Sequence, residues 1–232
     1  AGFIPKAEPI VMQLYSEPLQ KFRLAAEGKG AFVPPEHRAR IVKHFDPIPF
    51  WYPPFEGAMV DEEQFPLHAV TQRPMAMYHS WGSQNAWLRQ ITAANRLYVA
   101  RSLGERLGIA DNDWVWVVGH LGRVRCQVQL MEGVNEDTVW TWNAIGKRAG
   151  AWGLAPDSPE TTEGFLLNHL IGELLPVRDG GYRYLNSDPV TGQAAWYDLR
   201  VRIEKCDPGE PQETSPRFER LGTPPGAPER PA

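Results

Sequence analysis

One stretch of the chain, TQRPMAMYHS, concentrates side chains that can bind an oxygen-rich ligand. It begins at Thr71 and ends at Ser80, both of which carry hydroxyl groups, and Gln72 offers an amide. Arg73 adds a guanidinium fork suited to a phosphate or a carbonyl oxygen, and His79 adds an imidazole. On position alone, Arg73 is more simply a solvated surface charge and His79 a hydrogen-bonded loop residue. The stretch therefore predicts a binding site only if other features of the chain support it.

Two amides further along the chain are the other candidates. Asn168 interrupts the apolar run FLLNHL, where we expect it to be buried and to need hydrogen-bond partners. Such an amide is either a helix cap or a ligand contact. Asn143 follows Trp142 at the end of an expected strand, where an aromatic residue is more often part of the core than of a site.

The composition excludes several classes of protein. A formal charge of −4 and a pI near 5.9 give no broad basic surface, so nucleic acid is not an expected partner. The two cysteines, Cys126 and Cys206, support neither a disulfide framework nor a metal or iron–sulfur site. The chain contains no P-loop, GxGxxG, HExxH or GxSxG motif, and no apolar run long enough for a membrane span. We therefore expect no catalytic residues, no metal ligands and no direct membrane span in this chain.

Short strands must position the candidate residues. Runs rich in β-branched and aromatic residues predict strands at 67–71, 96–99, 113–118, 123–130, 138–142 and 199–204. The turn at 119–122 makes the third and fourth of these a hairpin. Ser102 and Glu105 have capping-box spacing, which predicts a short helix from Ser102 to Leu107 that ends at Gly108. Five or six short strands around one small helix are typical of a compact β-barrel.

Three regions follow from the distribution of proline and apolar residues. The ladder DPIPFWYPP at 46–54 cannot form a central strand or a helix interior, so it is interpreted as an ordered linker over the surface of a neighbouring domain, with a linker that merely spaces domains as the alternative. It lies in a first region, residues 1–64, which is helix-compatible at 18–27. Residues 65–206 form the compact domain. Residues 207–232 contain almost no apolar side chains, and we expect a disordered tail. Because the chain begins without Met, we also expect it to be part of a longer protein.

Six motifs follow one another in an order that resembles the C-terminal domain of catalytic subunits in the dimethyl sulfoxide reductase superfamily of molybdenum oxidoreductases. Each motif is weakly specific by itself, but their order is specific. The resemblance covers about Phe65 to Lys205, and LYSE at 14–17 with DPIP at 46–49 resembles the exit from the preceding molybdopterin domain. The six motifs are TQRPMAMYHS at 71–80, NRLYV at 95–99, LGIADNDWV at 107–115, GRV at 122–124, LLNHL at 166–170 and SDPVTGQ at 187–193.

The resemblance implies a mainly β fold, a double-psi β-barrel with one or two short helices, preceded by an extended proline-rich segment and followed by the disordered tail. It also implies a cofactor, molybdenum or tungsten held by two molybdopterin guanine dinucleotides, which this domain binds and caps. The strings NAWLR at 85–89 and TWNAIGK at 141–147 are most similar to the sulfite dehydrogenase and thiosulfate or polysulfide reductase group. The expected substrate is then a sulfur oxyanion. Formate dehydrogenase and nitrate reductase remain alternatives, as does a stand-alone β-barrel binding module without redox activity.

The family motifs assign cofactor-binding roles to a defined set of residues. Tyr197 stands where several relatives have a lysine, which puts a direct phosphate or pterin contact there in doubt. The expected set is Thr71, Gln72, Arg73, Pro74, Met77, Tyr78, His79, Ser80, Trp142, Asn143, Asn168 and Tyr197.

The resemblance also implies the protein partners of the chain and its cellular location. Its partners would be the remainder of its own catalytic subunit, which holds a 4Fe–4S cluster in an N-terminal domain, a separate iron–sulfur protein for electron transfer, and a membrane anchor. The isolated chain is expected to be inactive. The expected location is the cytoplasm, with membrane association through partner subunits, and the periplasm is the alternative.

Overall fold

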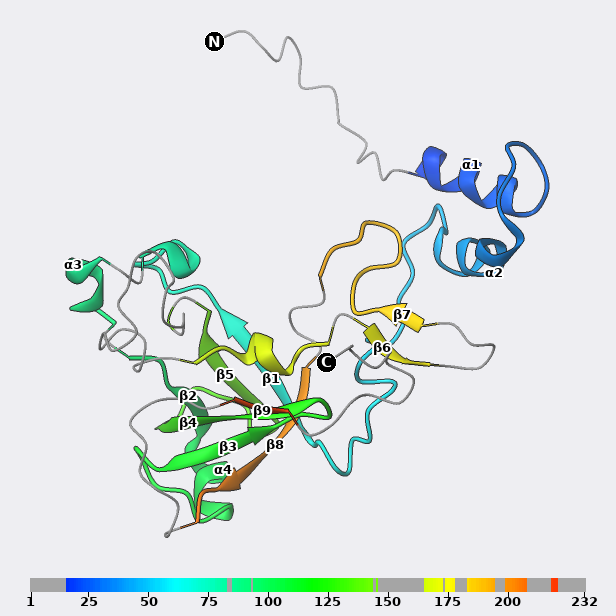
Figure 1. Cartoon of the computed structure of the whole chain (residues 1–232). Helices are drawn as coiled ribbons and strands as arrows, with labels where there is room; N and C mark the ends of the chain where they lie inside the picture. The colour runs from blue at the N-terminus through cyan, green and yellow to red at the C-terminus, as the bar shows by residue number, and fades with distance from the viewer. Residues whose placement is uncertain are drawn as a thin grey trace, which may run out of the picture. The chain divides into compact units, whose positions relative to one another are not determined.

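The computed structural model describes residues 16–82, 85–92, 94–143, 145, 165–172, 174–177, 183–194, 199–207 and 218–220. The chain divides into two compact units, one made of residues 1–53 and 188–193 and the other of residues 54–187 and 194–232 (Figure 1). The sequence predicts the main boundary at residue 64 and does not anticipate that residues 188–193 return to the first unit. Within the described residues no helix is long and apolar enough to cross a membrane.

The first unit contains two helices, α1 (Ser16–Ala26) and α2 (Pro35–His44). Helix α1 coincides with the helix-compatible segment. Helix α2 was not predicted, although Pro35 occupies its first turn, where a proline is favoured because its missing N–H has no intrahelical partner. The rings of Phe22 and Phe45 meet edge to face with centroids 5.6 Å apart, so the two helices share an apolar contact.

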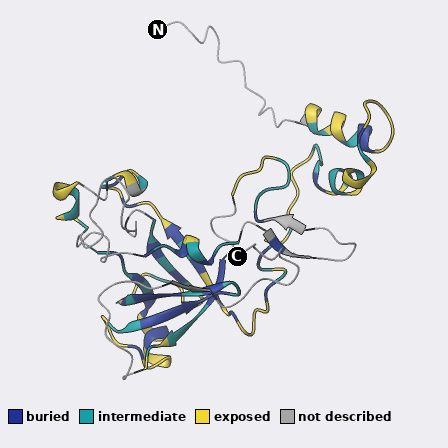
Figure 2. Ribbon diagram, viewed as in Figure 1, coloured by how far each residue is buried: buried dark blue, intermediate teal, exposed yellow. Residues whose placement is uncertain are grey.

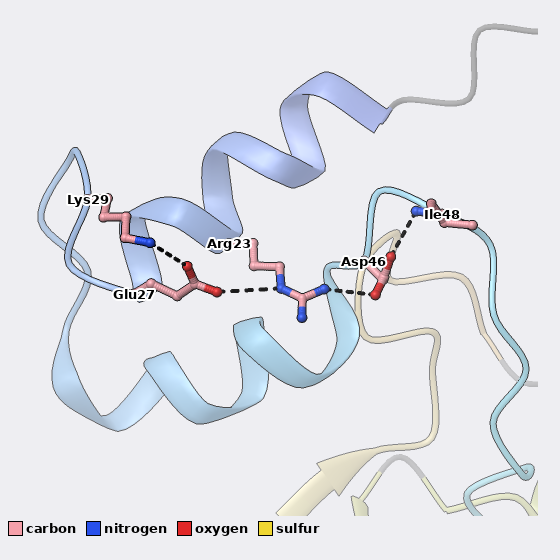
Figure 3. A network of polar contacts seen from close by, with 5 residues as sticks. All are labelled: Arg23, Glu27, Lys29, Asp46 and Ile48. Atoms are coloured by element: carbon pink, nitrogen blue, oxygen red, sulfur yellow. Dashed lines mark hydrogen bonds and ion pairs between the residues drawn. The ribbon is translucent and has the colours of Figure 1, made fainter.

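A polar network joins α1 to the segment that follows α2 (Figure 3). The guanidinium of Arg23 lies 2.8 Å from the carboxylate of Asp46 and 3.7 Å from that of Glu27, which also pairs with Lys29. The backbone N–H of Ile48 donates to Asp46 at 2.9 Å, and this bond together with Arg23 lowers the pKa of the Asp46 carboxyl. Because these groups are largely solvated, the network orients the chain more than it stabilises it.

The proline-rich segment is anchored by Tyr52. Its hydroxyl donates to the carboxylate of Asp188 at 2.7 Å, and burial together with this bond raises the pKa of Tyr52 to about 12. Burial opposes ionisation of Asp188, but hydrogen bonds from Thr191, Tyr52 and Val190 lower the pKa of this carboxyl nevertheless. The segment is therefore an ordered part of the first unit.

The second unit contains a closed barrel. Strands β1 (Leu67–Gln72), β2 (Leu97–Ala100), β3 (Trp114–Val118), β4 (Gly122–Met131), β5 (Thr138–Trp142) and β8 (Leu199–Lys205) follow the order β2-β5-β1-β8-β3-β4. Strand β2 also pairs with β4, so the six-stranded sheet closes on itself. The pairs β1–β5 and β2–β4 are parallel and the others antiparallel. The mainly β barrel fold with few short helices is confirmed, and each barrel strand lies where the sequence predicts one.

Three further strands were not predicted. Strands β6 (Leu174–Val177) and β7 (Arg183–Leu185) form a separate two-stranded sheet. Strand β9 (Phe218–Arg220) pairs with β4 at the edge of the main sheet. Because β9 falls within residues 207–232, the prediction of disorder is wrong for these three residues.

The barrel core follows from the alternation of side chains along each strand. Figure 2 shows the barrel strands as the largest buried region of the second unit. The inward-facing residues with no measurable exposure include Leu97, Val99, Val115, Val117, Cys126, Val128, Val139 and Val201.

Helix α4 (Arg101–Arg106) packs on this core through Leu103 and begins one residue earlier than predicted, with Ala100 as N-cap. Ser102 is therefore not the cap, and its hydroxyl instead bonds to Glu136.

Candidate functional site

The candidate residues converge at one edge of the barrel. Strands β1 and β5 are parallel neighbours, so their carboxyl ends meet at the same edge, and Gln72 lies opposite Trp142 in the register. The backbone N–H of Asn143 donates to the carbonyl of Gln72 at 2.8 Å and extends the pairing by one residue. The loop that follows β1 and the loop that follows β5 therefore leave the barrel side by side.

The loop after β1 presents Arg73 and Tyr78 to solvent. The guanidinium carbon of Arg73 lies 5.9 Å from the ring centroid of Tyr78, which is 67% exposed. Among the described residues, no carboxylate lies within ion-pair distance of Arg73. Gln72 is also exposed at the end of β1. These exposed groups can accept a ligand without breaking an existing ion pair.

Three other residues of the expected set, one at the end of β1 and two in the loop that follows, are buried. Thr71 faces the barrel interior, as does its register partner Thr141. Pro74 is buried, and Met77 is 3% exposed and packs against Ile145. These side chains hold the loop in place, so any direct contact they make with a cofactor would come from the backbone.

His79 and Asn143 connect the two loops through their side chains. His79 adopts a φ of 49°, which places it in the left-handed region and turns the chain into the short helix η1 (His79–Gly82). The side-chain nitrogen Nδ2 of Asn143 lies 3.5 Å from Nδ1 of His79. Ser80 lies within η1.

Asn143 supplies the clearest sign that this edge could bind a ligand. Within the described part of the chain, its buried side-chain oxygen accepts no hydrogen bond. A buried acceptor without a donor costs about 1–3 kcal/mol, which a donor group on a ligand would offset. A pterin dinucleotide offers a ring rich in hydrogen-bond donors and acceptors, a pyrophosphate and a guanine. The exposed guanidinium of Arg73 and the unpaired oxygen of Asn143 fit such a group.

Trp142 belongs to an aromatic cluster on the outer face of the barrel. Its indole N–H donates to the hydroxyl of Tyr98 at 3.1 Å, and the ring of Tyr98 stacks on Trp140 with centroids 3.9 Å apart. The ring of Trp142 meets Trp140 at an interplanar angle of 80°. Trp142 is thus half-buried and lies outside the barrel core.

Asn168 is exposed, so the prediction that it is buried is wrong. It lies in the short helix η4 (Leu167–Leu170), whose three-residue period directs Leu167 and Leu170 into the core and Asn168 away from it. Nor is it the helix cap, because the N-cap is Leu166 and no side-chain cap bond forms. Tyr197 lies outside the described residues.

Asn95, to which the sequence alone assigned no separate role, joins the segments of this edge. It is 5% exposed, and its Nδ2 lies 2.8 Å from the carbonyl of Trp142, 3.1 Å from that of Ile145 and 2.9 Å from that of Phe165. Its side-chain oxygen accepts from the Thr141 hydroxyl at 2.7 Å. The signal in the sequence was an amide directly before an apolar strand.

No group of three or more His, Cys, Asp or Glu that could hold a metal ion occurs among the residues that the structure describes. Within the described residues the edge therefore offers hydrogen-bonding groups and the guanidinium of Arg73. This chemistry suits the binding of a large polar cofactor.

Comparisons with known proteins agree with this geometry. Residues 67–174 match the family model described as Molydopterin dinucleotide binding domain. The chain is 56% identical over 227 residues to a sulfite dehydrogenase subunit of Allochromatium vinosum, and the alignment covers 97% of this chain and 24% of that protein. Dopamine dehydroxylase of Eggerthella lenta is 32% identical over 105 residues, which cover 43% of this chain and 10% of that protein.

A solved structure of acetylene hydratase from Pelobacter acetylenicus is 22% identical, with a TM-score of 0.48. The structural alignment covers 69% of this chain and 22% of the acetylene hydratase chain. The chain spans only 24% and 10% of the length of the two curated relatives described above.

Proposed function

We propose that the chain binds and caps a bis(molybdopterin guanine dinucleotide) cofactor of molybdenum, through residues 67–174, which match the molybdopterin dinucleotide-binding domain family. The resemblance indicated by the six motifs is confirmed by this match and by the 56% identity to a sulfite dehydrogenase subunit. The observation that supports binding at the β1–β5 edge is the buried, unpaired side-chain oxygen of Asn143 in one of two neighbouring loops, with Arg73, which has no carboxylate partner among the described residues, in the other.

The exposed residues of the edge would make the direct contacts. Arg73 would donate to a phosphate or pterin oxygen, and Asn143 would accept from a ring donor. Gln72, Tyr78 and Asn168 would add polar contacts around them. When bound, the cofactor supplies oxygen-atom or electron-transfer chemistry at molybdenum, while these side chains orient it and exclude water.

The remaining members of the expected set would act in other ways. Thr71, Pro74 and Met77 are buried and would shape the loop. His79 would hold Asn143 in place, and Trp142 would fix the end of β5 through its contact with Tyr98. For Ser80 and Tyr197 we retain the cofactor contacts that the family motifs assign to these positions.

The proposed substrate is a sulfur oxyanion such as sulfite or thiosulfate, oxidised or reduced by the longer catalytic subunit of which this chain would be the C-terminal part. The support is the sulfite dehydrogenase relative, whose alignment covers 97% of this chain. The proposed partners are the rest of that subunit with its 4Fe–4S cluster, a separate iron–sulfur protein for electron transfer, and a membrane anchor. We place the complex in the cytoplasm, with the periplasm as the alternative.

The test is cofactor analysis of the purified full-length subunit. Molybdenum would be measured by mass spectrometry, and guanine nucleotide and oxidised pterin by chromatography after denaturation. We expect about two guanine nucleotides per molybdenum, together with sulfite-dependent reduction of an artificial electron acceptor. A subunit that contains neither molybdenum nor pterin would refute the binding proposal. A loaded subunit that reduces the acceptor with formate but not with sulfite would refute only the substrate.

A further inference from the structure

The amide of Asn95 lies where three separate backbone segments meet. Asn95 lies two residues before the start of β2. The three carbonyls near its Nδ2 belong to Trp142 at the end of β5, to Ile145 in the loop that follows and to Phe165 before η4. The first two segments flank Asn143, and the third leads to Asn168. The side chain of Asn95 thus contacts the backbone segments that carry Asn143 and Asn168, two of the residues proposed to bind the cofactor.

The hydrogen-bond pattern around Asn95 uses both ends of the amide. Its Nδ2 has two hydrogens for three carbonyl oxygens, and its oxygen accepts from the Thr141 hydroxyl and, at 3.2 Å, from the backbone N–H of Trp142. The Trp142 residue is therefore held from both its N–H and its carbonyl. Because the amide is buried, these bonds lie in a low-dielectric environment, where an unsatisfied group is costly.

We propose that Asn95 is a positioning residue for the cofactor: it fixes the loop of Asn143 and the entry to η4 in the arrangement that faces the ligand. This inference rests on the proposed function. Asn95 acts through the backbone of Trp142, Ile145 and Phe165, and it need not touch the cofactor itself.

Two substitutions separate this role from simple packing. Asn95→Leu is similar in volume but removes every donor and acceptor. Asn95→Asp keeps the shape and the acceptor but replaces the amide nitrogen, which faces three carbonyls, by an oxygen. An ionised carboxylate cannot donate to a carbonyl, whereas a protonated carboxyl can donate one hydrogen bond. The aspartate variant should therefore recover part of its function as the pH is lowered, and the leucine variant should not.

Thr141→Val is the matched control. It removes the hydroxyl that donates to the Asn95 oxygen and to the Arg96 carbonyl, but it leaves the three carbonyl contacts of the Asn95 nitrogen in place. It should lower the melting temperature without changing cofactor content. If lower stability of the barrel were enough to cause loss of cofactor, this control would lose cofactor as well.

The experiment uses the full-length subunit with wild-type, Asn95→Leu, Asn95→Asp and Thr141→Val sequences. Guanine nucleotide and molybdenum per subunit, the rate of nucleotide release from the purified enzyme and the melting curve would be measured between about pH 7.5 and about pH 5.5. We expect nucleotide release about tenfold faster in both Asn95 variants at the higher pH, as is usual for lost supporting contacts. At the lower pH, the release rate of Asn95→Asp should move back toward that of wild type. The release rate of Asn95→Leu should stay about as far above wild type as before.

The outcomes distinguish the two proposals. Wild-type protein without cofactor would overturn the proposed function and with it this role. A loaded wild type whose Asn95 variants retain cofactor as wild type does, or lose it only to the degree seen in Thr141→Val, would overturn the role of Asn95 alone. If Asn95→Leu fails to fold, nucleotide release from Asn95→Asp still tests the role of Asn95: release that slows at the lower pH supports it, and release that does not change with pH contradicts it.

Discussion

Arg73 differs from other exposed arginines of the barrel in its partners. Arg101 and Arg106 each lie within 3.0 Å of a glutamate carboxylate, whereas Arg73 contacts only the ring of Tyr78 among the described residues. A guanidinium without an anionic partner beside a buried, unpaired acceptor is an arrangement that a phosphate-bearing ligand would complete.

The first prediction is that Arg73 matters by geometry as well as by charge. In the full-length subunit, Arg73→Lys should lose part of the bound molybdenum and guanine nucleotide and Arg73→Ala more, because an ammonium cannot make two parallel hydrogen bonds. Melting curves would exclude misfolding. Arg106→Ala, which removes an arginine already paired with Glu136, is the control and should retain full occupancy. Unchanged occupancy in Arg73→Ala would remove Arg73 from the site.

Asn168 leads to a second prediction. Because the residue is exposed, an effect on cofactor binding can be separated from an effect on stability. Because its side chain is solvent-exposed and caps no helix, Asn168→Leu should change the free energy of unfolding by no more than about 0.5 kcal/mol. Cofactor content of the full-length subunit should nevertheless fall, since a polar contact to the ligand is lost. Denaturant unfolding and nucleotide analysis would measure the two effects separately. Normal content would show that Asn168 is only a surface residue.

His120 carries a prediction about pH. Its imidazole lies in the turn between β3 and β4, 3.5 Å from the fully buried carboxylate of Glu56, which also accepts from Asn186 at 2.9 Å. Burial lowers the pKa of His120 below its ordinary value of 6.5. The unfolded chain therefore binds the proton more readily, and stability must fall as the pH drops from about 6.5 toward the lower folded pKa.

The expected loss is roughly 1 kcal/mol for each unit by which the pKa is lowered. Urea unfolding of the chain at a series of pH values, followed by tryptophan fluorescence, would measure it. His120→Gln should reduce the slope in this window and leave the part that comes from buried His44, whose pKa is also lowered by burial, whereas His37→Gln, at an exposed position of α2, should leave the slope unchanged. A wild-type curve that is flat below pH 6.5 would contradict the lowered pKa.

At the scale of single residues, the sequence predicted the polar types of the site but not their exposure. Arg73 and Tyr78 lie in a loop whose polar character is visible in the sequence, and both are exposed. Burial of Met77 depends on Ile145, and the importance of Asn95 depends on carbonyls up to 70 positions away. Contacts over such distances leave no local pattern in the chain.

At the scale of elements, alternation of apolar and polar side chains was enough to predict the six barrel strands, because each buries one face. Helix α2 was missed because its sequence PEHRARIVKH is mostly polar and only His44 is buried in it. Strands β6, β7 and β9 have three or four residues each, too few for a period to be detected. The parallel pairing of β1 with β5, which builds the site, also has no local signal.

Helix α4 gives a prediction at this scale. A Cβ added at Gly104 would lie 2.6 Å from the side chain of Leu130 and 3.2 Å from the carbonyl oxygen of Ile109, which as backbone cannot easily move. Gly104→Ala should therefore destabilise the chain by about 1–3 kcal/mol even though alanine favours helices. Gly133→Ala, where the nearest neighbour is the end of Met131 at 3.8 Å, is the control in urea unfolding. Equal stability of both variants would show that α4 tolerates a shift away from β4.

At the scale of the whole molecule, the side chains that the chain offers limit what it could contribute to a cofactor site. The barrel edge supplies amides, a guanidinium and an imidazole, groups suited to binding and orienting a polar ligand, and the described residues include no cluster of metal-binding side chains. The first unit adds its own network around Arg23 and its anchor at Tyr52. Under the proposed function, the chain would contribute hydrogen-bonding groups to the cofactor site, and the metal would be held by the cofactor and by the rest of the proposed subunit.

The last prediction is that the purified 232-residue chain alone binds no stoichiometric molybdenum and does not turn over sulfite, thiosulfate or formate. Two cysteines, one of them buried in the core, cannot build a cluster that accepts electrons, and a single edge of hydrogen-bonding groups cannot enclose a metal. Metal analysis and an artificial-acceptor assay would be run with the full-length protein as positive control. Circular dichroism would establish that the barrel is folded in the isolated chain. Stoichiometric molybdenum or sulfite-dependent turnover in that folded chain would mean that it holds a complete active site.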